Sequence, residues 1–266
     1  MNRNRPIGVF DSGIGGLSVV KELRRLLPRE EIVYFGDTAR LPYGTKSKET
    51  VVRFSCEILR FLMRFKIKTG VVACHTASSF SLPTLRRHFP IPIVGVVQPG
   101  TRVALLKTRN GRIGVLGTRA TIQSRSYEKE IRRLAPKARV FSRSCPLFVP
   151  LVEEGHFNGN ITTQIARNYL TPVARSGVDT VILGCTHYPL LKDVIGSVFG
   201  RKVKLVDSAQ AVAWQVRTLL EAQDLLTDGN EGRTRFFVSD EPRHFAKIGR
   251  LFLKDTIDTV RKVRHV

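Results

Sequence analysis

Two short stretches decide how this chain is organised: Val71-Val72-Ala73-Cys74-His75-Thr76 and Val181-Ile182-Leu183-Gly184-Cys185-Thr186-His187. Each is an apolar run that closes on a cysteine, with a hydroxyl and an imidazole among the next two residues. Short apolar runs bounded by turn residues are typical of buried strands in parallel sheets. We therefore interpret both stretches as strand ends, and we expect the two cysteines to belong to one active site.

The rest of the chain alternates short strands with helical periods, which favours α/β layers with mainly parallel sheets. Two of these periods predict helices from about Ser78 to His88 and near Ala120–Leu134. The segment Ile113-Gly114-Val115-Leu116-Gly117-Thr118 repeats the pattern of Ile7-Gly8-Val9-Phe10-Asp11-Ser12, and the cysteines recur in the same order. A break at Gln98-Pro99-Gly100 separates the two copies. The sequence thus predicts two similar three-layer α/β (Rossmann-like) domains, related by a pseudo-two-fold, with the active site in the cleft between them.

The repeated pattern ends before the C-terminus, so we expect the last segment to pack back on the first half. This gives a first domain of residues 1–97 with 208–266, which carries Cys74. The second domain is residues 98–207, which carries Cys185.

Composition is that of an ordinary soluble globular protein, with 42% hydrophobic and 25% charged residues in a chain of 266. No signal-peptide apolar region opens the chain, and no apolar run approaches the roughly 18 residues that a transmembrane helix needs. The four cysteines form no Cys-x-x-Cys pair, which gives little support for a zinc site or a disulfide framework. We predict a cytoplasmic protein with no membrane association and no metal.

The formal net charge of +22 is extreme and favours association with anions, nucleic acid included, through a salt-sensitive non-specific attraction. The basic residues are nevertheless scattered as pairs over most of the predicted helices. No helix-turn-helix, zinc-finger or aromatic-interleaved basic motif accompanies them. We interpret the charge as a solvated basic surface, with non-specific nucleic-acid association as a further expectation.

Polar residues gather at the predicted strand ends, where open α/β sheets bind their ligands. These positions are Asp11-Ser12, Cys74, Thr118 and Cys185-Thr186-His187. The glycine-rich turn Gly13–Gly16 begins a predicted helix, whose free N–H groups could hold a carboxylate or a phosphate. This turn matches neither Gly-x-Gly-x-x-Gly nor the Walker A pattern, so nucleotide binding is poorly supported.

Two cysteines in one site indicate a particular kind of proton chemistry. Cationic neighbours and helix N-termini lower the pKa of a thiol and make a thiolate available near neutrality. One Cys–His pair would indicate a covalent nucleophile. Two cysteines on opposing walls instead favour a two-base reaction, in which one thiolate removes a proton from carbon and the other thiol returns one to the opposite face. Taken singly, either cysteine could be only a packed strand-end residue.

Six blocks of the chain resemble those of bacterial glutamate racemases, within the aspartate/glutamate racemase family. They run in family order from residue 7 to about residue 208. The blocks are Asp11–Ser18, Gly36–Arg40 with Pro42–Lys46, Ala73–Ser78, Gly117–Thr121, Phe148–Gly155 and Leu183–Leu190.

The resemblance implies a racemase that needs no cofactor, interconverts L- and D-glutamate and supplies D-glutamate for peptidoglycan. It implies that Cys74 deprotonates the D-enantiomer and Cys185 the L-enantiomer. Asp11 would assist Cys74, while Glu153 and His187 would assist Cys185. From the residues alone, Asp11 could be a turn residue, Glu153 a helix-end charge and His187 a structural imidazole.

The resemblance also implies the substrate contacts and a homodimer, which the family commonly forms. The contacts would be Asp11, Ser12, Tyr43, Gly44, His75, Thr76, Thr118, Thr121, Thr186 and His187.

His75 departs from the family pattern, which usually has Asn after the first cysteine. A neutral imidazole offers one donor and one acceptor, but it is bulkier than an amide and it titrates. This keeps open a racemase or epimerase for another amino acid, such as aspartate or diaminopimelate. The +22 charge keeps open a nucleic-acid-binding or gyrase-interacting protein, since some glutamate racemases act on DNA gyrase.

Overall fold

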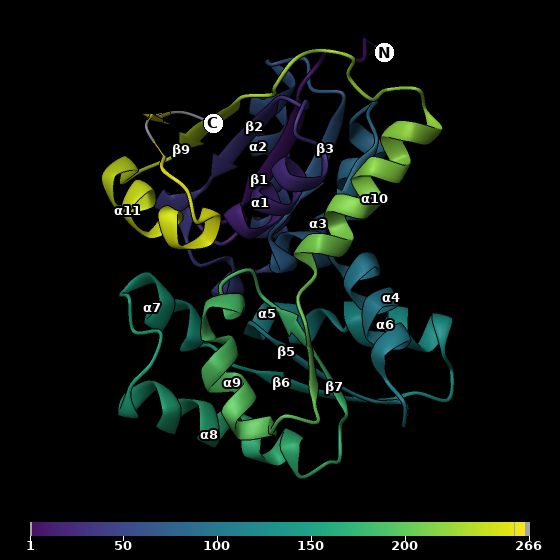
Figure 1. The fold of residues 1–266 in the computed structure, drawn as a ribbon, viewed down its shortest axis with the longest axis vertical. Helices are drawn as coiled ribbons and strands as arrows, with labels where there is room; N and C mark the ends of the chain where they lie inside the picture. The colour runs from purple at the N-terminus through teal and green to yellow at the C-terminus, as the bar shows by residue number, and fades with distance from the viewer. Residues whose placement is uncertain (1, 258, 264–266) are drawn as a thin grey trace. The chain divides into compact units, whose positions relative to one another are not determined.

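The computed structural model describes residues 2–257 and 259–263 (Figure 1). The chain divides into two compact units, Met1–Val96 with Ala209–Val266, and Val97–Ser208. The sequence-based domain boundaries lie one residue from these. Each unit holds one parallel sheet with helices packed on it, so the predicted fold class, two α/β domains with mainly parallel sheets, is confirmed.

The first unit is built on a sheet in the order β10-β9-β2-β1-β3-β4, in which every pairing is parallel. Its strands are β1 Ile7–Asp11, β2 Ile32–Gly36, β3 Thr69–Val72, β4 Ile93–Gly95, β9 Thr234–Val238 and β10 Val260–Lys262. Its helices are α1 Leu17–Leu26, η1 Thr38–Arg40, η2 Tyr43–Thr45, α2 Lys48–Met63, α3 His75–His88, α10 Ala209–Ala222 and α11 Pro242–Leu253. Strands β1 to β4 are buried throughout, as expected of a parallel sheet covered on both faces.

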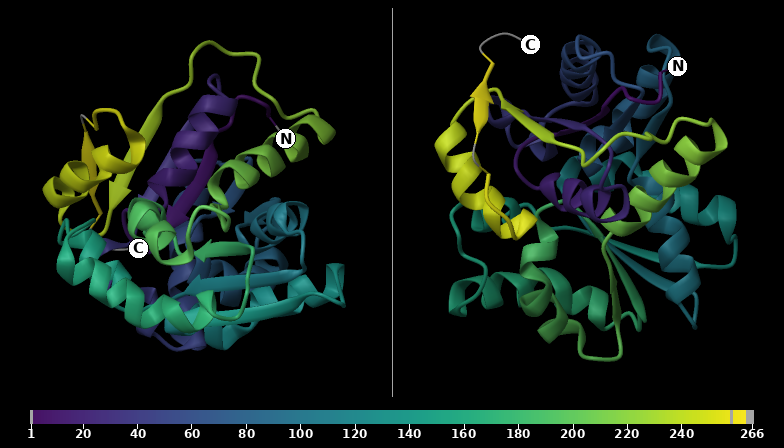
Figure 2. Two further views of the ribbon diagram at one scale, coloured as in Figure 1. Left: turned by 60° about the horizontal axis from the view of Figure 1, so that its bottom comes forward. Right: turned by 45° about the horizontal axis from the view of Figure 1, so that its top comes forward.

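The C-terminal segment completes the first sheet. Strand β9 pairs with β2 in the register Ile32↔Thr234, and β10 pairs with β9. The yellow C-terminal elements lie beside the purple strands in Figures 1 and 2. In the structure, the last segment thus packs on the sheet of the first half. Strand β10 was not predicted, because its residues Val-Arg-Lys carry no alternation that separates them from the basic tail.

The second unit has a sheet in the order β6-β5-β7-β8, again parallel throughout. Its strands are β5 Arg112–Gly117, β6 Arg139–Ser144, β7 Thr180–Gly184 and β8 Lys204–Val206. Its helices are α4 Val97–Lys107, α5 Arg119–Ser124, α6 Ser126–Leu134, α7 Phe148–Glu153, α8 Asn160–Ala174, η3 Tyr188–Leu191 and α9 Lys192–Phe199. The order matches β2-β1-β3-β4 of the first unit, so the repeat inferred from the sequence is visible in the topology.

Two helical regions differ from the expectation. Helix α4 runs through Gln98-Pro99-Gly100, which was predicted to be a break. Proline is tolerated in the first turn of a helix, where its missing N–H would have no partner in any case. The helix predicted over residues 120–134 is two helices, α5 and α6, because Arg125 adopts a left-handed conformation with φ of 54°.

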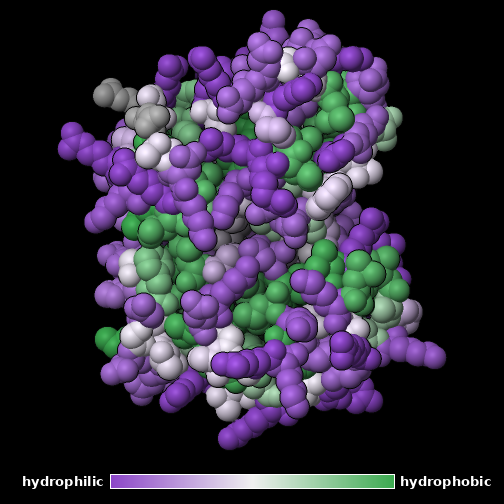
Figure 3. Space-filling view, in the orientation of Figure 1, coloured by the Kyte–Doolittle hydropathy of each residue, from purple (hydrophilic) through white to green (hydrophobic). Residues whose placement is uncertain are grey.

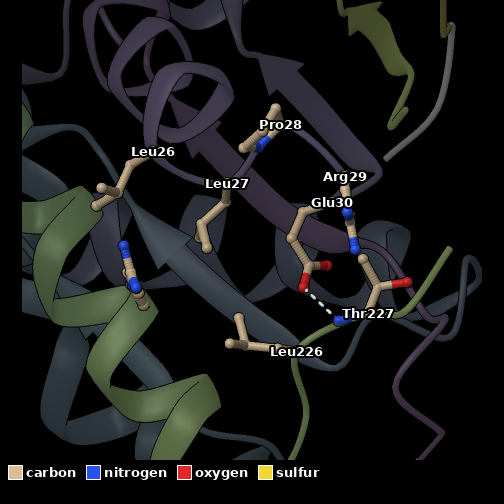
Figure 4. Close-up of a pocket in the computed structure, with 8 residues that line it drawn as sticks. Leu26, Leu27, Pro28, Arg29, Glu30, Leu226 and Thr227 are labelled. Atoms are coloured by element: carbon tan, nitrogen blue, oxygen red, sulfur yellow. Dashed lines mark hydrogen bonds between the residues drawn. The ribbon is translucent and has the colours of Figure 1, made fainter. Parts of the chain in front are cut away.

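A buried ion pair lies at the amino ends of the first sheet. Lys68 Nζ is 2.5 Å from Glu30 Oε2, and both side chains are almost completely buried. Lys68 also donates to the carbonyls of Arg3 and Leu225, and Glu30 accepts from Thr227 N at 3.0 Å (Figure 4). The pair therefore ties the N-terminal segment to the segment after α10. The pocket in Figure 4, of about 260 Å³, is lined by none of the predicted site residues.

We expect Glu30→Gln to lower the free energy of unfolding by about 2 kcal/mol, since Lys68 loses a charged hydrogen-bond partner.

Burial lowers the pKa of Lys68. The unfolded chain therefore binds a proton more readily, and stability rises as the pH approaches 10.5. Without the Glu30 carboxylate this rise becomes steeper. Urea unfolding at pH 7 and pH 9 measures both effects, with Glu31→Gln, at a half-exposed carboxylate, as the control. Equal stability of Glu30→Gln and the wild type at pH 7 would contradict the prediction.

The surface is largely hydrophilic on the side drawn in Figure 3. Some basic side chains pair with acidic ones on their own helix, as Arg25 does with Glu22 and Arg133 with Glu130. These pairs fit the interpretation of a solvated basic surface, and nucleic-acid association stays a prediction. None of the helices in the described ranges has both the length and the apolar character to cross a membrane.

Candidate active site

Cys74 lies at the carboxyl edge of the first sheet and also at the start of a helix. The register Phe10↔Val72 places the end of β3 beside the end of β1. Cys74 is the N-cap of α3, and its Sγ accepts a hydrogen bond from Ala77 N at 3.5 Å. The helix was predicted to begin near Ser78, which is wrong, because the thiol takes the capping role that a hydroxyl usually has. The thiol is therefore at the positive end of a helix dipole, which favours its thiolate.

Asp11 and Ser12 lie next to this thiol. Cys74 Sγ donates to Ser12 Oγ at 3.5 Å. The Asp11 side chain is fully buried at the end of β1, and its Oδ2 accepts from Gly13 N at 3.0 Å. Tyr34 Oη in turn donates to Gly13 O at 2.8 Å, which fixes the turn. The structure thus brings Ser12 against Cys74 and holds Asp11 at the adjoining strand end.

Tyr43 and Gly44 lie buried in η2, in the loop that follows β2. Tyr43 Oη donates to Asp37 Oδ2, and Arg40 Nε donates to the same oxygen at 2.6 Å. Burial, Asp37 and the nearby Cys74 raise the pKa of Tyr43 far above 10, so its hydroxyl stays protonated and donates. Sequence reasoning missed Asp37. The available signal was a carboxylate directly after a strand, inside a block that carries the resemblance.

His75 and Thr76 form the first turn of α3, and both are buried. Burial lowers the pKa of His75 to about 3. The imidazole is therefore neutral at physiological pH and offers one N–H donor and one acceptor nitrogen, so that, like a side-chain amide, it presents both a donor and an acceptor. The hydrogen-bonding difference between His75 and the asparagine usual in the family is thus smaller than the residue types suggest.

The second unit repeats the arrangement around β5 and β7. The register Gly117↔Gly184 places the ends of these two strands side by side, with Thr118 after one and Cys185 after the other. Thr118 caps α5, since its Oγ1 accepts from Thr121 N at 3.2 Å, and the two hydroxyl oxygens are 3.0 Å apart. Cys185 therefore lies at the same sheet edge as a pair of threonine hydroxyls at a helix N-terminus.

Thr186 and His187 follow Cys185, and both are buried. His187 Nδ1 is 3.9 Å from Cys185 Sγ, and its Nε2 pairs with Glu153 Oε1 at the end of α7. Burial alone would lower the pKa of His187. Hydrogen bonds to Cys185 and Glu153, together with the charges of both groups, instead raise it well above 6.5. The His187 ring thus links a thiol to a carboxylate, and these two neighbours favour the cationic form of the ring.

The other two cysteines have different surroundings. Cys145 is buried, and its Sγ donates to Arg143 O at 3.8 Å. Burial raises the pKa of Cys145 to about 12 and also raises that of Cys56, which is half-buried on α2. Both thiols therefore stay protonated, as is typical of cysteines that serve only in packing.

Metal-ligand clusters are not found in the described part of the chain, where no three His, Cys, Asp or Glu residues are arranged to hold an ion. Within each unit, the predicted site residues lie at the carboxyl ends of the strands or in the loops and helices that follow them. The catalytic and substrate-binding roles assigned to them stay predictions.

Comparisons with known proteins identify related chains. Residues 7–216 match the family described as Asp/Glu/Hydantoin racemase. A glutamate racemase of Geobacter metallireducens is 51% identical over 260 residues, which cover 97% of this chain and 96% of that protein. The crystal structure of a glutamate racemase isoform from Bacillus anthracis matches with a TM-score of 0.95 and 40% identity, over 98% of both chains. The glutamate racemase of Francisella tularensis, solved in complex with D-glutamate, matches with a TM-score of 0.92 and 38% identity, also over 98% of both chains.

Proposed function

The chain belongs to the Asp/Glu/Hydantoin racemase family, and we propose that it interconverts L-glutamate and D-glutamate without a cofactor, which supplies D-glutamate for peptidoglycan. The observation that carries the proposal is the pair of strand-end cysteines, each with its own proton-handling neighbours. Cys74 caps α3 beside Ser12, and Cys185 lies against His187 and Glu153. The relatives named as glutamate racemases support the choice of substrate.

The proposed reaction is a proton exchange at the α-carbon. With D-glutamate, the Cys74 thiolate takes the α-proton, the electron pair stays on the α-carbon, and the Cys185 thiol donates a proton to the opposite face. With L-glutamate the two thiols exchange roles. Each turnover leaves one cysteine protonated and the other ionised, in the reverse of the starting arrangement. The α3 N-terminus supports the Cys74 thiolate, and cationic His187 supports the Cys185 thiolate.

Glutamate binding requires donors for two carboxylates and an acceptor for the ammonium group. The helix starts at Cys74 and Thr118 supply N–H groups and hydroxyls suited to carboxylates. The buried Asp11 carboxylate suits the ammonium group and could also assist Cys74. The proposed contacts are those that the resemblance implies, namely Asp11, Ser12, Tyr43, Gly44, His75, Thr76, Thr118, Thr121, Thr186 and His187.

A substrate panel tests this function. Purified protein without added cofactor is incubated with each enantiomer of glutamate, aspartate and diaminopimelate, and optical activity is followed by circular dichroism. We expect racemisation of glutamate only. Faster turnover of aspartate or diaminopimelate would favour the alternative activity within the family, and no turnover of any substrate would contradict the proposal.

His75→Asn should leave glutamate preference intact and change kcat/KM by less than about tenfold, because a neutral imidazole and an amide each present both a donor and an acceptor. Burial lowers the pKa of His75 to about 3. The kcat/KM profiles of the wild type and the variant should therefore coincide between pH 6 and pH 8. If kcat/KM of the wild type changed with pH in that range and that of the variant did not, His75 would not be neutral there, and the prediction would be contradicted.

Partners and location form a separate part of the proposal. We propose a cytoplasmic homodimer, as the resemblance implies, and light scattering on the purified chain measures its mass. Nucleic-acid association driven by the +22 charge should weaken steeply with salt. Titration of duplex DNA at physiological salt decides whether anything beyond this non-specific attraction remains.

A further inference from the structure

The turn between β9 and α11 contacts the loop that carries Tyr43. Ser239 follows β9 directly, and its backbone N–H donates to Gly36 O at 3.1 Å, which extends the pairing of β9 with β2 by one bond. We call Ser239 and Asp240 the tether. Both lie beyond residues 7–216, the part of the chain that matches the family.

The Ser239 hydroxyl bonds to the loop twice. It donates to Asp37 Oδ1 at 2.9 Å, and it accepts from Ala39 N at 2.8 Å. One hydroxyl thus links a carboxylate to the backbone at the start of η1.

Asp240 makes a reciprocal pair with the same loop. Thr38 Oγ1 donates to Asp240 O at 2.5 Å and accepts from Asp240 N at 2.9 Å. Lys262 of β10 forms an ion pair with the Asp240 carboxylate. The loop is therefore fastened at two adjacent residues to the C-terminal part of the sheet.

Asp37 connects the tether to the predicted substrate contacts. Its side chain is fully buried, and a buried carboxylate is tolerated only when its oxygens are hydrogen-bonded. Oδ1 accepts from Ser239, while Oδ2 accepts from Tyr43 Oη and from Arg40. The orientation of the carboxylate, and with it the position of the Tyr43 hydroxyl, thus depends on the donor at Oδ1.

We propose that Ser239 is a positioning residue for substrate binding: it orients Asp37, which in turn holds Tyr43 and the adjoining Gly44 where glutamate binds. The inference rests on the proposed function, because it takes Tyr43 and Gly44 as contacts of glutamate. Ser239 itself acts through Asp37 and need not touch the substrate.

The main test is Ser239→Ala. We expect KM for both glutamate enantiomers to rise about tenfold with kcat within about twofold, since loss of a hydrogen bond to a charged group disturbs binding rather than proton transfer. The Ala39 amide should exchange its hydrogen faster in the absence of substrate. Ser239→Thr keeps the hydroxyl and should restore both values. Ser176→Ala removes a hydroxyl that bonds only within the end of α8, and it should change neither.

A double-mutant cycle separates the tether from a general loss of stability. If Ser239 acts through Asp37 on Tyr43, the effects of Ser239→Ala and Tyr43→Phe on KM should be clearly less than additive. Additive effects, or wild-type values of KM and of the Ala39 exchange rate in Ser239→Ala, would overturn the proposal. A wild-type chain that racemises no glutamate would overturn the proposed function instead. In that case the exchange rate of the Ala39 amide would test whether Ser239 holds the loop in place.

Discussion

Replacing either Cys74 or Cys185 by alanine is expected to lower kcat for glutamate racemisation at least about 10³-fold in both directions. In the proposed mechanism each thiol is the base for one enantiomer and the acid for the other, so neither direction should proceed without both. General acid–base groups contribute about 10²- to 10⁴-fold each, and alanine provides no proton at all. Circular dichroism measures the rate from each pure enantiomer.

The matched control is Cys56→Ala, which removes a half-buried thiol on α2. It should retain near-normal turnover, while both active-site variants should remain folded by far-ultraviolet circular dichroism. Racemisation in deuterated buffer should place deuterium on the α-carbon. Near-normal turnover of either active-site variant, or racemisation without deuterium incorporation, would contradict the two-base mechanism.

The strand framework was predictable because its signals are local. The runs that end at Asp11 and Cys74 are apolar, short and bounded by turn residues, and they form β1 and β3 close to the expected bounds. Helix α4 was missed because Pro99 is a strong breaker in most positions but not in a first turn. The early start of α3 was missed because cysteine is an uncommon N-cap.

The residues that support the site were harder to predict than the residues nearest the thiols. Cys185 and His187 are neighbours in sequence, so their contact could be anticipated. Asp37 and Ser239 are 202 residues apart, and only the pairing of β9 with β2 brings them together. Glu153 was placed near Cys185 by resemblance alone, since no local pattern shows that the end of α7 meets His187.

Glu153→Gln is expected to lower kcat/KM for glutamate about 10²-fold at neutral pH. Glu153 is one of the groups that raise the pKa of His187 well above 6.5, while burial opposes them. Without the charge of Glu153, the His187 imidazole loses its proton at lower pH. The Cys185 thiolate then has no cationic neighbour. The alkaline limb of the kcat/KM profile should therefore move to lower pH. Glu154→Gln, at the exposed neighbouring carboxylate, is the matched control.

The free energy of unfolding should also depend on pH through the protonation of His187. A folded-state pKa above the unfolded value contributes stability that is complete below about pH 6.5 and is lost as pH rises through the raised pKa of His187. Glu153→Gln should reduce this contribution and flatten the dependence of stability on pH. Urea unfolding between pH 5 and pH 9 measures it, and an unchanged pH dependence would show that Glu153 does not control the protonation of His187.

The effect of α-deuteration on kcat/KM should distinguish whether Glu153 assists proton transfer at Cys185 or at Cys74. The enantiomers have equal free energies, so kcat/KM must fall by the same factor in both directions. If Glu153 acts through His187 on Cys185, the barrier for proton transfer at Cys185 becomes the higher one. The effect of α-deuteration on kcat/KM should then grow for L-glutamate, whose deuteron goes to Cys185, and shrink for D-glutamate, whose deuteron goes to Cys74. A larger effect for D-glutamate and a smaller one for L-glutamate would show that Glu153 assists proton transfer at Cys74. That result would contradict the role inferred from the contact between His187 and Cys185.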